Sequence, residues 1–424
     1  MKIKRKKNSL LIIIAVLLSG VSSPAVYAAN TTKAGKPYTL EELVVLAEKN
    51  NLLVKISELD KDIAREEYRD ARALSNPQLE YAGGKGEIPG EPEKPMIWGI
   101  GIKWSAPNPL HRYFFLKSMK ADVTGAEIEA EIKKKNIVKG LKIHYYRLCL
   151  YGKIKTLMEE KRRILNEVNR IIKAKVSIGE SKEIDFLRSS VEIRKNETRL
   201  FQIRKRISSE RTKLAEFLNY TLPAEFSTTE DFSFTPLPEI EKRIRGLIDK
   251  SPFIRLKFNR LDKQKAHLKA SRFSIIDSVE FFGEREKEME GKLWKVGVGV
   301  SIPLFNRKSA HFKKAKYQKE KARIECEHAK KHFFADIQRR ISEIRVLEKE
   351  IETFKGAVLK EGRVNMELSE KLYKAGEVPL LVFLDSQNSF FEIKERFYEA
   401  ITEWNILKAE LYELIGEEIW ETKY

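Results

Sequence analysis

The sequence predicts a mainly helical protein that carries a smaller β portion and is built from two copies of one unit. Three observations support this prediction: a segment that recurs 197 positions later, helical periodicity over long stretches, and two pairs of alternating strands. The predicted order in each copy is helix, strand, strand, long helix and helix.

The repeat is clearest at a turn that contains glycine. Residues 176–187 match residues 373–384, which aligns Gly179 with Gly376. The offset between the copies changes by only a few positions along the chain, so the copies differ mainly in the lengths of their loops. We therefore divide the chain into a first repeat, a linker and a second repeat, at residues 29–222, 223–238 and 239–424.

Apolar residues at helical spacing predict the helices. One stripe in the second copy has spacings of three and four: Ile337, Ile341, Ile344, Leu347, Ile351, Phe354 and Val358. About 65 residues without proline form each long helix, which makes a rod of roughly 100 Å. We predict helices over about 39–74, 110–175, 180–219, 239–274, 307–375 and 377–416.

A period of two predicts the strands. Apolar side chains alternate with glycine, lysine or serine in both copies, as expected for a strand with lipid on one side and water on the other. Trp98, Trp104 and Trp294 lie near strand ends, where an interfacial aromatic belt would place them. An ordinary soluble sheet packed on a core is the alternative. The predicted strands span about 77–84, 97–105, 278–284 and 293–303, with exposed loops at 83–95 and 284–291.

Four strands are too few to close a membrane barrel, because the smallest such barrels have about eight. An open sheet edge in lipid leaves backbone groups unpaired, at a cost of several kcal/mol each. The strand count therefore predicts that the protein forms an oligomer if these strands span a membrane.

The first 28 residues predict a secretory signal peptide. A basic start precedes an apolar run at 10–18, and small residues follow before position 29. Cysteine first occurs at position 149, so a lipid-attachment cysteine behind the apolar run is not expected. The chain has a formal charge of +19, but an exported protein without a nucleic-acid motif is not expected to bind nucleic acid. Lipid phosphates or an acidic partner fit this charge better.

An ordered set of short motifs resembles the TolC-like outer-membrane efflux family, the outer membrane factors of tripartite efflux systems. The motifs occupy residues 38–43 (YTLEEL), 73–79 (ALSNPQL), 298–307 (VGVSIPLFNR), 373–377 (YKAGE), 383–385 (FLD) and 411–416 (LYELIG). The length and the missing lipid-attachment cysteine resemble the heavy-metal-efflux (CzcC-like) branch.

The resemblance implies a homotrimer with a twelve-strand β-barrel in the outer membrane and a twelve-helix tunnel through the periplasm. It also implies a periplasmic adaptor protein and an inner-membrane efflux pump as partners, no cofactor and a passive role in efflux or type I export. The alternative is a soluble periplasmic coiled-coil adaptor or scaffold.

The resemblance further implies that the turns at Gly179 and Gly376 lie at the periplasmic tip, where the adaptor docks. It implies that Asp185 and Asp385 line or lock the aperture. Arg188 matches Asp385 across the repeat, so the two could be ion-paired between neighbouring helices. The alternative is that these are ordinary solvated helix charges.

We assign no catalytic site and no metal site. His328, His332 and Asp336 share one helical face at spacings of four, so a divalent-metal site here, or an enzyme borne on the helices, is a further alternative. The sequence is not His-Glu-x-x-His, so a zinc hydrolase is not indicated. Neighbouring lysines oppose cation binding there. Cys149 and Cys326 do not correspond across the repeat, and we expect no disulfide between them.

Overall fold

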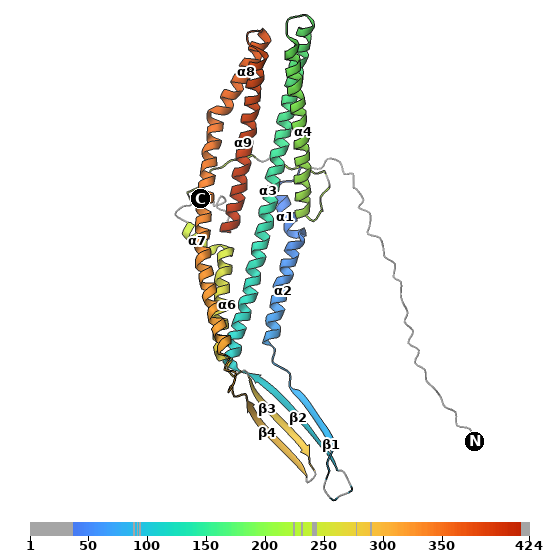
Figure 1. The fold of residues 1–424 in the computed structure, drawn as a ribbon, viewed down its shortest axis with the longest axis vertical. Helices are drawn as coiled ribbons and strands as arrows, with labels where there is room; N and C mark the ends of the chain where they lie inside the picture. The colour runs from blue at the N-terminus through green and yellow to red at the C-terminus, as the bar shows by residue number, and fades with distance from the viewer. Residues whose placement is uncertain are drawn as a thin grey trace, which may run out of the picture.

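We describe the protein from a computed structural model. The structure describes residues 37–416 except 88–89, 91, 93–94, 224, 230–231, 240–243, 277 and 289–290. The predicted signal peptide at 1–28 lies outside the described residues. The molecule is elongated, with a sheet at one end, two helical turns at the other, and a long helical body between them (Figure 1). None of the helices in the described ranges contains an apolar stretch of the length that a membrane-spanning helix needs.

Both repeats have the same order of elements. The first contains α1 (Leu40–Asn50), α2 (Leu52–Arg72), β1 (Gln78–Lys85), β2 (Met96–Pro107), α3 (Pro109–Ser177) and α4 (Glu183–Phe217). The second contains α5 (Ile244–Lys250), α6 (Pro252–Phe273), β3 (Ser278–Lys287), β4 (Lys292–Val300), α7 (Ser309–Thr353), the π-helical turn η1 (Phe354–Val358), α8 (Leu359–Ala375) and α9 (Leu380–Ile415).

The first helix of each repeat is divided in two at corresponding places, where the sequence predicted one helix. Asn51 separates α1 from α2, because its Oδ1 accepts a hydrogen bond from the Leu53 amide at 2.9 Å. Its Nδ2 donates to the Phe217 carbonyl at 2.8 Å and so ties this break to the end of α4. Ser251 separates α5 from α6, and proline follows at the first position of α6.

The second long helix also departs from the predicted single rod. The turn η1 interrupts it between α7 and α8. Such π-turns insert an extra residue into a helix and bend it locally. The apolar stripe of α7 is confirmed as core, since Ile337, Ile344 and Ile351 are fully buried.

The four strands form one antiparallel sheet in the order β1-β2-β3-β4. Strand β3 is longer than predicted. Residues 284–287, expected in a hairpin tip, pair with β4, and Glu284 lies opposite Lys295. Strand β4 ends at Val300 rather than about 303, since Val300 pairs with Val279 at the start of β3. Pro303 lies beyond this end and has no N–H to donate to a sheet.

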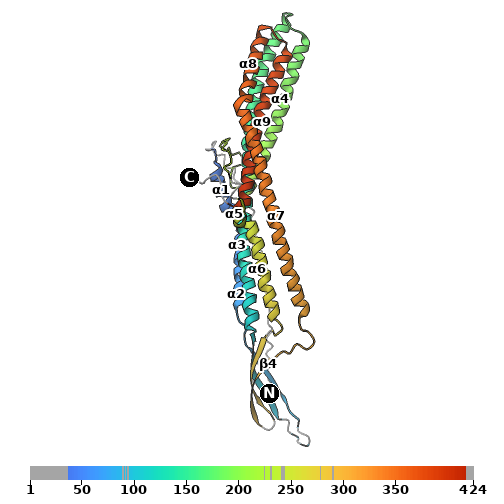
Figure 2. The same ribbon diagram turned by 90° about the vertical axis from the view of Figure 1, so that its left-hand side faces the viewer.

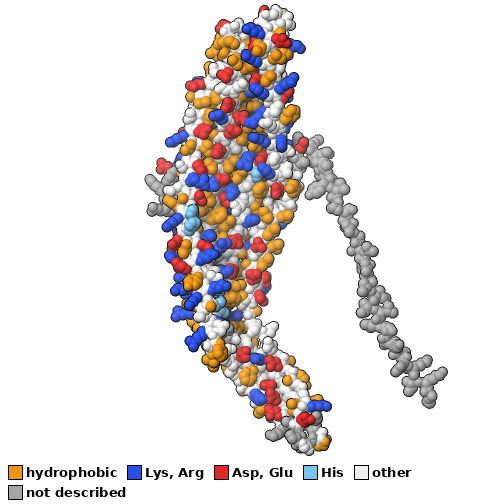
Figure 3. Space-filling model, in the orientation of Figure 1, with side chains coloured by type: hydrophobic (Ala, Val, Ile, Leu, Met, Phe, Trp, Pro, Cys, Tyr) orange, Lys and Arg blue, Asp and Glu red, His pale blue; other side chains and the backbone are white. Residues whose placement is uncertain are grey.

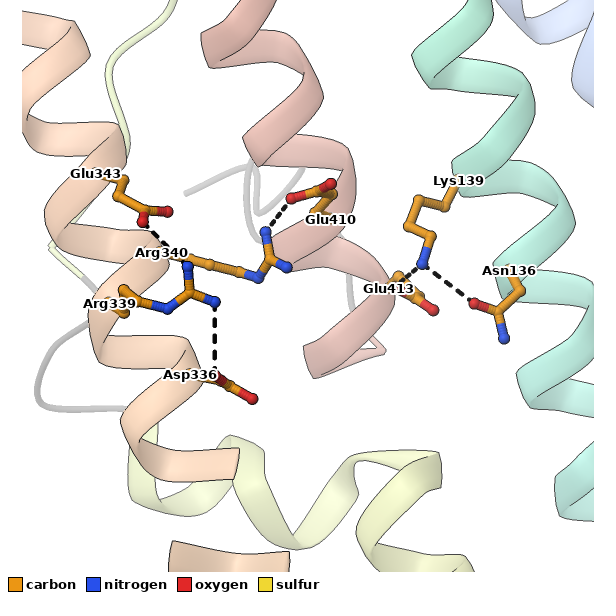
Figure 4. Close-up of polar contacts among 8 residues, drawn as sticks. All are labelled: Asn136, Lys139, Asp336, Arg339, Arg340, Glu343, Glu410 and Glu413. Carbon is orange, nitrogen blue, oxygen red and sulfur yellow. Dashed lines mark hydrogen bonds and ion pairs between the residues drawn. The ribbon is translucent and has the colours of Figure 1, made fainter. Parts of the chain in front are cut away.

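Buried side chains hold the two repeats against one another. One buried cluster joins Leu150 and Ile154 of α3, in the first repeat, to Phe390 and Phe391 of α9, in the second. Within the second repeat the stripe of α7 packs on α9, so α9 lies between α7 and α3 (Figure 1). Ion pairs at this level join the same three helices (Figure 4). Lys139 of α3 donates to Glu413 of α9 at 2.7 Å, and Arg340 of α7 pairs with Glu410 of α9.

The described part of the linker packs on the helical body. Phe226 and Leu237 of the linker are buried. Residue Tyr38 forms a β-bridge with Thr228, and the buried carboxylate of Glu348 accepts hydrogen bonds from the Leu237 amide and from Trp404 Nε1. The linker therefore fixes the two repeats together rather than acting as a loose connection.

Candidate functional site

Two regions carry the sequence-predicted functional residues, one at each end of the molecule. The first is the pair of helical turns. Gly179 and Gly376 both have left-handed backbones, with φ of 78° and 82°. At each turn the glycine amide donates a hydrogen bond to the carbonyl of the residue three positions earlier. The next amide donates to the carbonyl five positions earlier, and all four bonds are 2.9–3.1 Å long. This is the Schellman arrangement that ends a helix, and it occurs at both copies of the repeat.

An apolar cluster packs the two turns against one another. It joins residues of α3, α8 and α9: Leu165, Val168, Ile172, Tyr373, Leu380, Phe383 and Leu384. The matched pairs differ in burial. Phe383 and Leu384 are in the core, whereas Phe186 is only partly buried and Leu187 is exposed. The two hairpins are therefore similar in backbone but not equivalent in position.

Asp185 lies on the side of the first turn that faces the second hairpin. It is partly buried, and the hydroxyl of Ser181 donates to its carboxylate at 3.4 Å. Burial raises the pKa of Tyr373, and the negative charge of Asp185 raises it further. Asp185 is therefore close enough to the second hairpin to act on Tyr373 electrostatically.

Arg188 and Asp385 are both exposed side chains near the turns. Among the described residues of this single chain, no ion pair joins Arg188 to Asp385. The ion pair that sequence analysis suggested between neighbouring helices therefore does not form within one protomer. A role of these residues and of Asp185 at an aperture stays a prediction.

The second region is the sheet, whose register separates two faces. Residues directly opposite each other share a face, and Ile102 lies opposite Leu79 and Gly283, while Gly283 lies opposite Val296. This face is apolar and open, since Val296 is 86% exposed and Leu79 74% exposed. Its charged side chains are confined to the end away from the helices: Lys85, Arg285, Lys287 and Lys292.

The opposite face is polar and acidic. It carries the glycines that alternate with the apolar residues, and the ring of Phe282 lies over Gly297. Its charged residues are Glu80, Lys103, Glu280, Glu284, Glu286 and Lys295. The shared position of these carboxylates is not visible in the sequence, because only the register of the strands places them on one face.

The three tryptophans lie near the two ends of the strands. Trp98 and Trp294 are near the end away from the helices, where the Arg285 guanidinium lies 5.0 Å from the Trp294 ring centroid. Trp104 is near the helical end, where its Nε1 donates to the Ser75 carbonyl at 2.9 Å. Trp98 and Trp104 are six positions apart, about 20 Å along the strand.

The remaining residues from the sequence analysis lie on the helical body. The rings of His328 and His332 are 4.1 Å apart, and Asp336 pairs with Arg339 at 3.6 Å. Within the described part of the chain, no cluster of three metal-ligating side chains has metal-binding geometry. Cys149 and Cys326 are both buried free thiols, and Cys149 donates to the Thr229 carbonyl at 3.4 Å.

Comparisons with known proteins agree with these observations. Residues 284–417 match a family described as outer membrane efflux protein. No curated protein sequence matches the chain.

Solved structures share the fold over nearly the whole chain. CusC is 15% identical with a TM-score of 0.77, and the match covers 94% of this chain and 99% of CusC. The Campylobacter jejuni CmeC outer membrane channel is 13% identical with a TM-score of 0.76, over 91% of this chain and 87% of CmeC. The open Neisseria gonorrhoeae MtrE outer membrane channel is 17% identical with a TM-score of 0.74, over 90% and 89%.

The predicted fold class and the resemblance to TolC-like outer-membrane proteins are confirmed by these matches. The assignment to the heavy-metal-efflux branch stays a prediction.

Proposed function

Because residues 284–417 carry an outer membrane efflux protein domain and the whole chain has the fold of solved outer-membrane channels, we propose that this protein is the passive exit duct of a tripartite efflux or type I export system. It lies in the outer membrane through its strands, and its helices extend into the periplasm. It encloses a water-filled path for small molecules or metal ions, and an inner-membrane pump supplies the energy.

The observation that carries this proposal is the sheet. Its apolar face is exposed, its opposite face is polar, and its outer strands β1 and β4 each have one unpaired edge in the described chain. A lipid-facing open edge is costly, so these edges pair with other copies. Three copies of this four-stranded sheet supply twelve strands, enough to close a barrel.

In this trimer the apolar face of the sheet contacts lipid and the acidic face lines the water-filled lumen. The helical turns at Gly179 and Gly376 form the periplasmic tip, to which a periplasmic adaptor protein docks. Asp185, Arg188 and Asp385 each become rings of three near this tip. A ring of carboxylates at a narrow point favours cations over anions. We expect no catalytic activity and no bound cofactor.

The exposed apolar face also argues against a soluble periplasmic adaptor or scaffold. Apolar patches of this extent are rare on soluble monomers, because they promote association. A soluble adaptor would have to cover this face with another element, and the described helices lie beyond the end of the sheet rather than over it (Figure 1).

Single-channel recording tests the proposal. The protein is purified in detergent and added to a planar phosphatidylcholine bilayer. We expect discrete, uniform conductance steps, because one trimer encloses one lumen. Protein that inserts but gives no steps under any applied voltage, with or without an adaptor, would contradict a duct.

A further inference from the structure

A strongly basic segment joins the sheet to the helical body in the second repeat. Between Phe305 and Lys319 the chain has six basic residues and no Asp or Glu. We call these residues the basic segment: Arg307, Lys308, Lys313, Lys314, Lys316 and Lys319. They occupy the connection from β4 and the first turns of α7. Figure 3 shows Lys and Arg side chains gathered over the strand-proximal end of the helical body.

Most of these charges are not neutralised by the protomer. Within the part of the chain that the structure describes, Arg307, Lys313, Lys314 and Lys316 form no ion pair, and all four are exposed. The rest of α7 is different. Arg323 pairs with Glu320 at 2.7 Å, and Arg339 with Glu343 at 3.1 Å. The absence of pairing is therefore a property of this end of α7 rather than of the whole helix.

Apolar side chains accompany the basic segment and also lack cover. Phe305 is fully exposed, and Ile302, Leu304 and Tyr317 are each at least two-thirds exposed. Aromatic and aliphatic side chains next to lysines are typical of segments at a membrane surface. The rings and chains enter the interface, while the cations remain among the headgroups.

The position of the basic segment in the fold also indicates a membrane surface as its partner. Strand β4 ends at Val300, and its apolar face carries Val296 and Val298 on the side that we assign to lipid. This inference rests on the proposed function at this point. If the strands span the outer membrane, the residues directly after β4 lie at its periplasmic surface (Figure 2).

The first repeat lacks an equivalent segment. At the corresponding place Arg112 donates to the backbone carbonyls of Ala73 and Arg72, so its charge holds the end of α2. Lys117 and Lys120 are exposed there, but Asp122 follows within one turn and pairs with Lys263. The charge asymmetry between the repeats is not required by the duplicated fold.

We propose that the basic segment binds the headgroups of anionic phospholipids in the periplasmic leaflet of the outer membrane. Each protomer supplies one such site, between the lipid-facing end of β4 and the start of α7. The lysines recognise the phosphate charge, and Phe305 with its apolar neighbours fixes the depth of the protein in the leaflet. A cation near an anionic lipid surface contributes about fivefold to binding.

Native mass spectrometry of the detergent-purified protein tests this proposal. The protein is titrated with phosphatidylglycerol and, separately, with zwitterionic phosphatidylcholine. We expect phosphatidylglycerol to bind at least about tenfold more tightly, with an excess that falls as salt is raised. The triple variant K313Q/K314Q/K316Q should lose at least about tenfold of this preference.

A matched triple variant near the opposite end of the helices, K173Q/K360Q/K371Q, removes the same charge and should keep the preference. Equal binding of the two lipids by the unaltered protein, or an unchanged preference in K313Q/K314Q/K316Q, would overturn the proposal. Conductance in phosphatidylcholine bilayers separates the two claims. A channel that conducts there but does not prefer phosphatidylglycerol refutes the lipid site alone, whereas failure to conduct refutes the duct.

Discussion

Asp185 and Asp385 have different surroundings, although the family resemblance implies one role for both. Asp185 is partly buried, and its carboxylate accepts a hydrogen bond from Ser181 and acts on Tyr373 of the second hairpin. Asp385 is exposed on α9, and Arg188 occupies the corresponding position in the first repeat. If only one of them lies at a constriction of the trimer, the exposed Asp385 is the better candidate.

Replacing Asp385 with Asn should raise the single-channel conductance or reduce the preference for cations. The reason is that three carboxylates leave the proposed aperture at once. Single-channel recording in a salt gradient measures both quantities. Asp60→Asn is the control, because Asp60 is an exposed acid on α2, remote from the turns. If Asp385→Asn and Asp60→Asn both behave as the unaltered protein, Asp385 is not at the constriction.

Two glycines of α3 should respond to alanine in opposite directions. A Cβ at Gly140 would lie 2.6 Å from Phe217 Cζ, so Gly140→Ala forces the ring to move and should cost about 1–3 kcal/mol. A Cβ added at Gly152 would have no described atom of the chain within 4 Å. Gly152→Ala should stabilise the protein by about 0.5–1 kcal/mol, because alanine loses less backbone entropy in a helix.

Chemical denaturation followed by circular dichroism measures both changes in unfolding free energy. Equal effects of the two substitutions would show that Phe217 does not restrict the space at Gly140.

At the scale of elements, periodicity alone predicts most of the helices and strands. The stripe of α7 is visible as spacings of three and four, and it forms the core against α9. The breaks are not visible in this way. Asn51 ends α1 because it bonds both to Leu53 and to the carbonyl of Phe217, which is 166 residues away. The π-turn η1 likewise has no signal in the apolar pattern.

The two faces of the sheet show a similar limit. Alternation predicts an apolar and a polar side for each strand. Only the register brings Glu80 of β1 and Glu284 of β3 onto the same face, through their partners on β2. The basic segment is different, because its run of lysines without acids is present in the sequence. A role in binding lipid can be inferred for this segment only once the structure places it at the junction of sheet and helices.

Two histidines from separate elements contact each other at this junction, and His111 of α3 lies nearby. His267 of α6 has its ring 5.8 Å from that of His311 of α7. Burial lowers the pKa of His267, and the nearby positive charges of His311, Lys263, Lys314 and His111 lower it further. The folded protein therefore binds this proton less tightly than the unfolded chain does.

It follows that the contribution of His267 to stability is present at pH values above its unfolded pKa of about 6.5 and is lost as the pH falls below that value. We expect the thermal midpoint to decrease between about pH 7.5 and 5.5, with a smaller decrease in His267→Gln. Differential scanning fluorimetry across this range measures the effect. His332→Gln, on the exposed face of α7, should keep the full decrease. A decrease of the same size in His267→Gln would assign the pH dependence to other groups.

At the scale of the whole molecule, one protomer leaves part of its apolar surface and of its sheet edges uncovered. Its helical body has buried apolar clusters along its length. Ion pairs also hold α9 between α3 and α7. Its sheet has an exposed apolar face and two open edges among the described residues. In the proposed trimer, lipid covers the apolar face and neighbouring copies pair with the open edges. The membrane and the oligomer are therefore both a requirement of this protomer.

The protein mass of the particle tests this requirement most directly. The mature chain is extracted from membranes in detergent, and light scattering is corrected for the bound detergent. We expect about three chains per particle and no soluble protein without detergent, because three four-stranded sheets close one barrel. A monomer or dimer that is soluble without detergent would contradict the duct and would make the sheet part of a periplasmic scaffold.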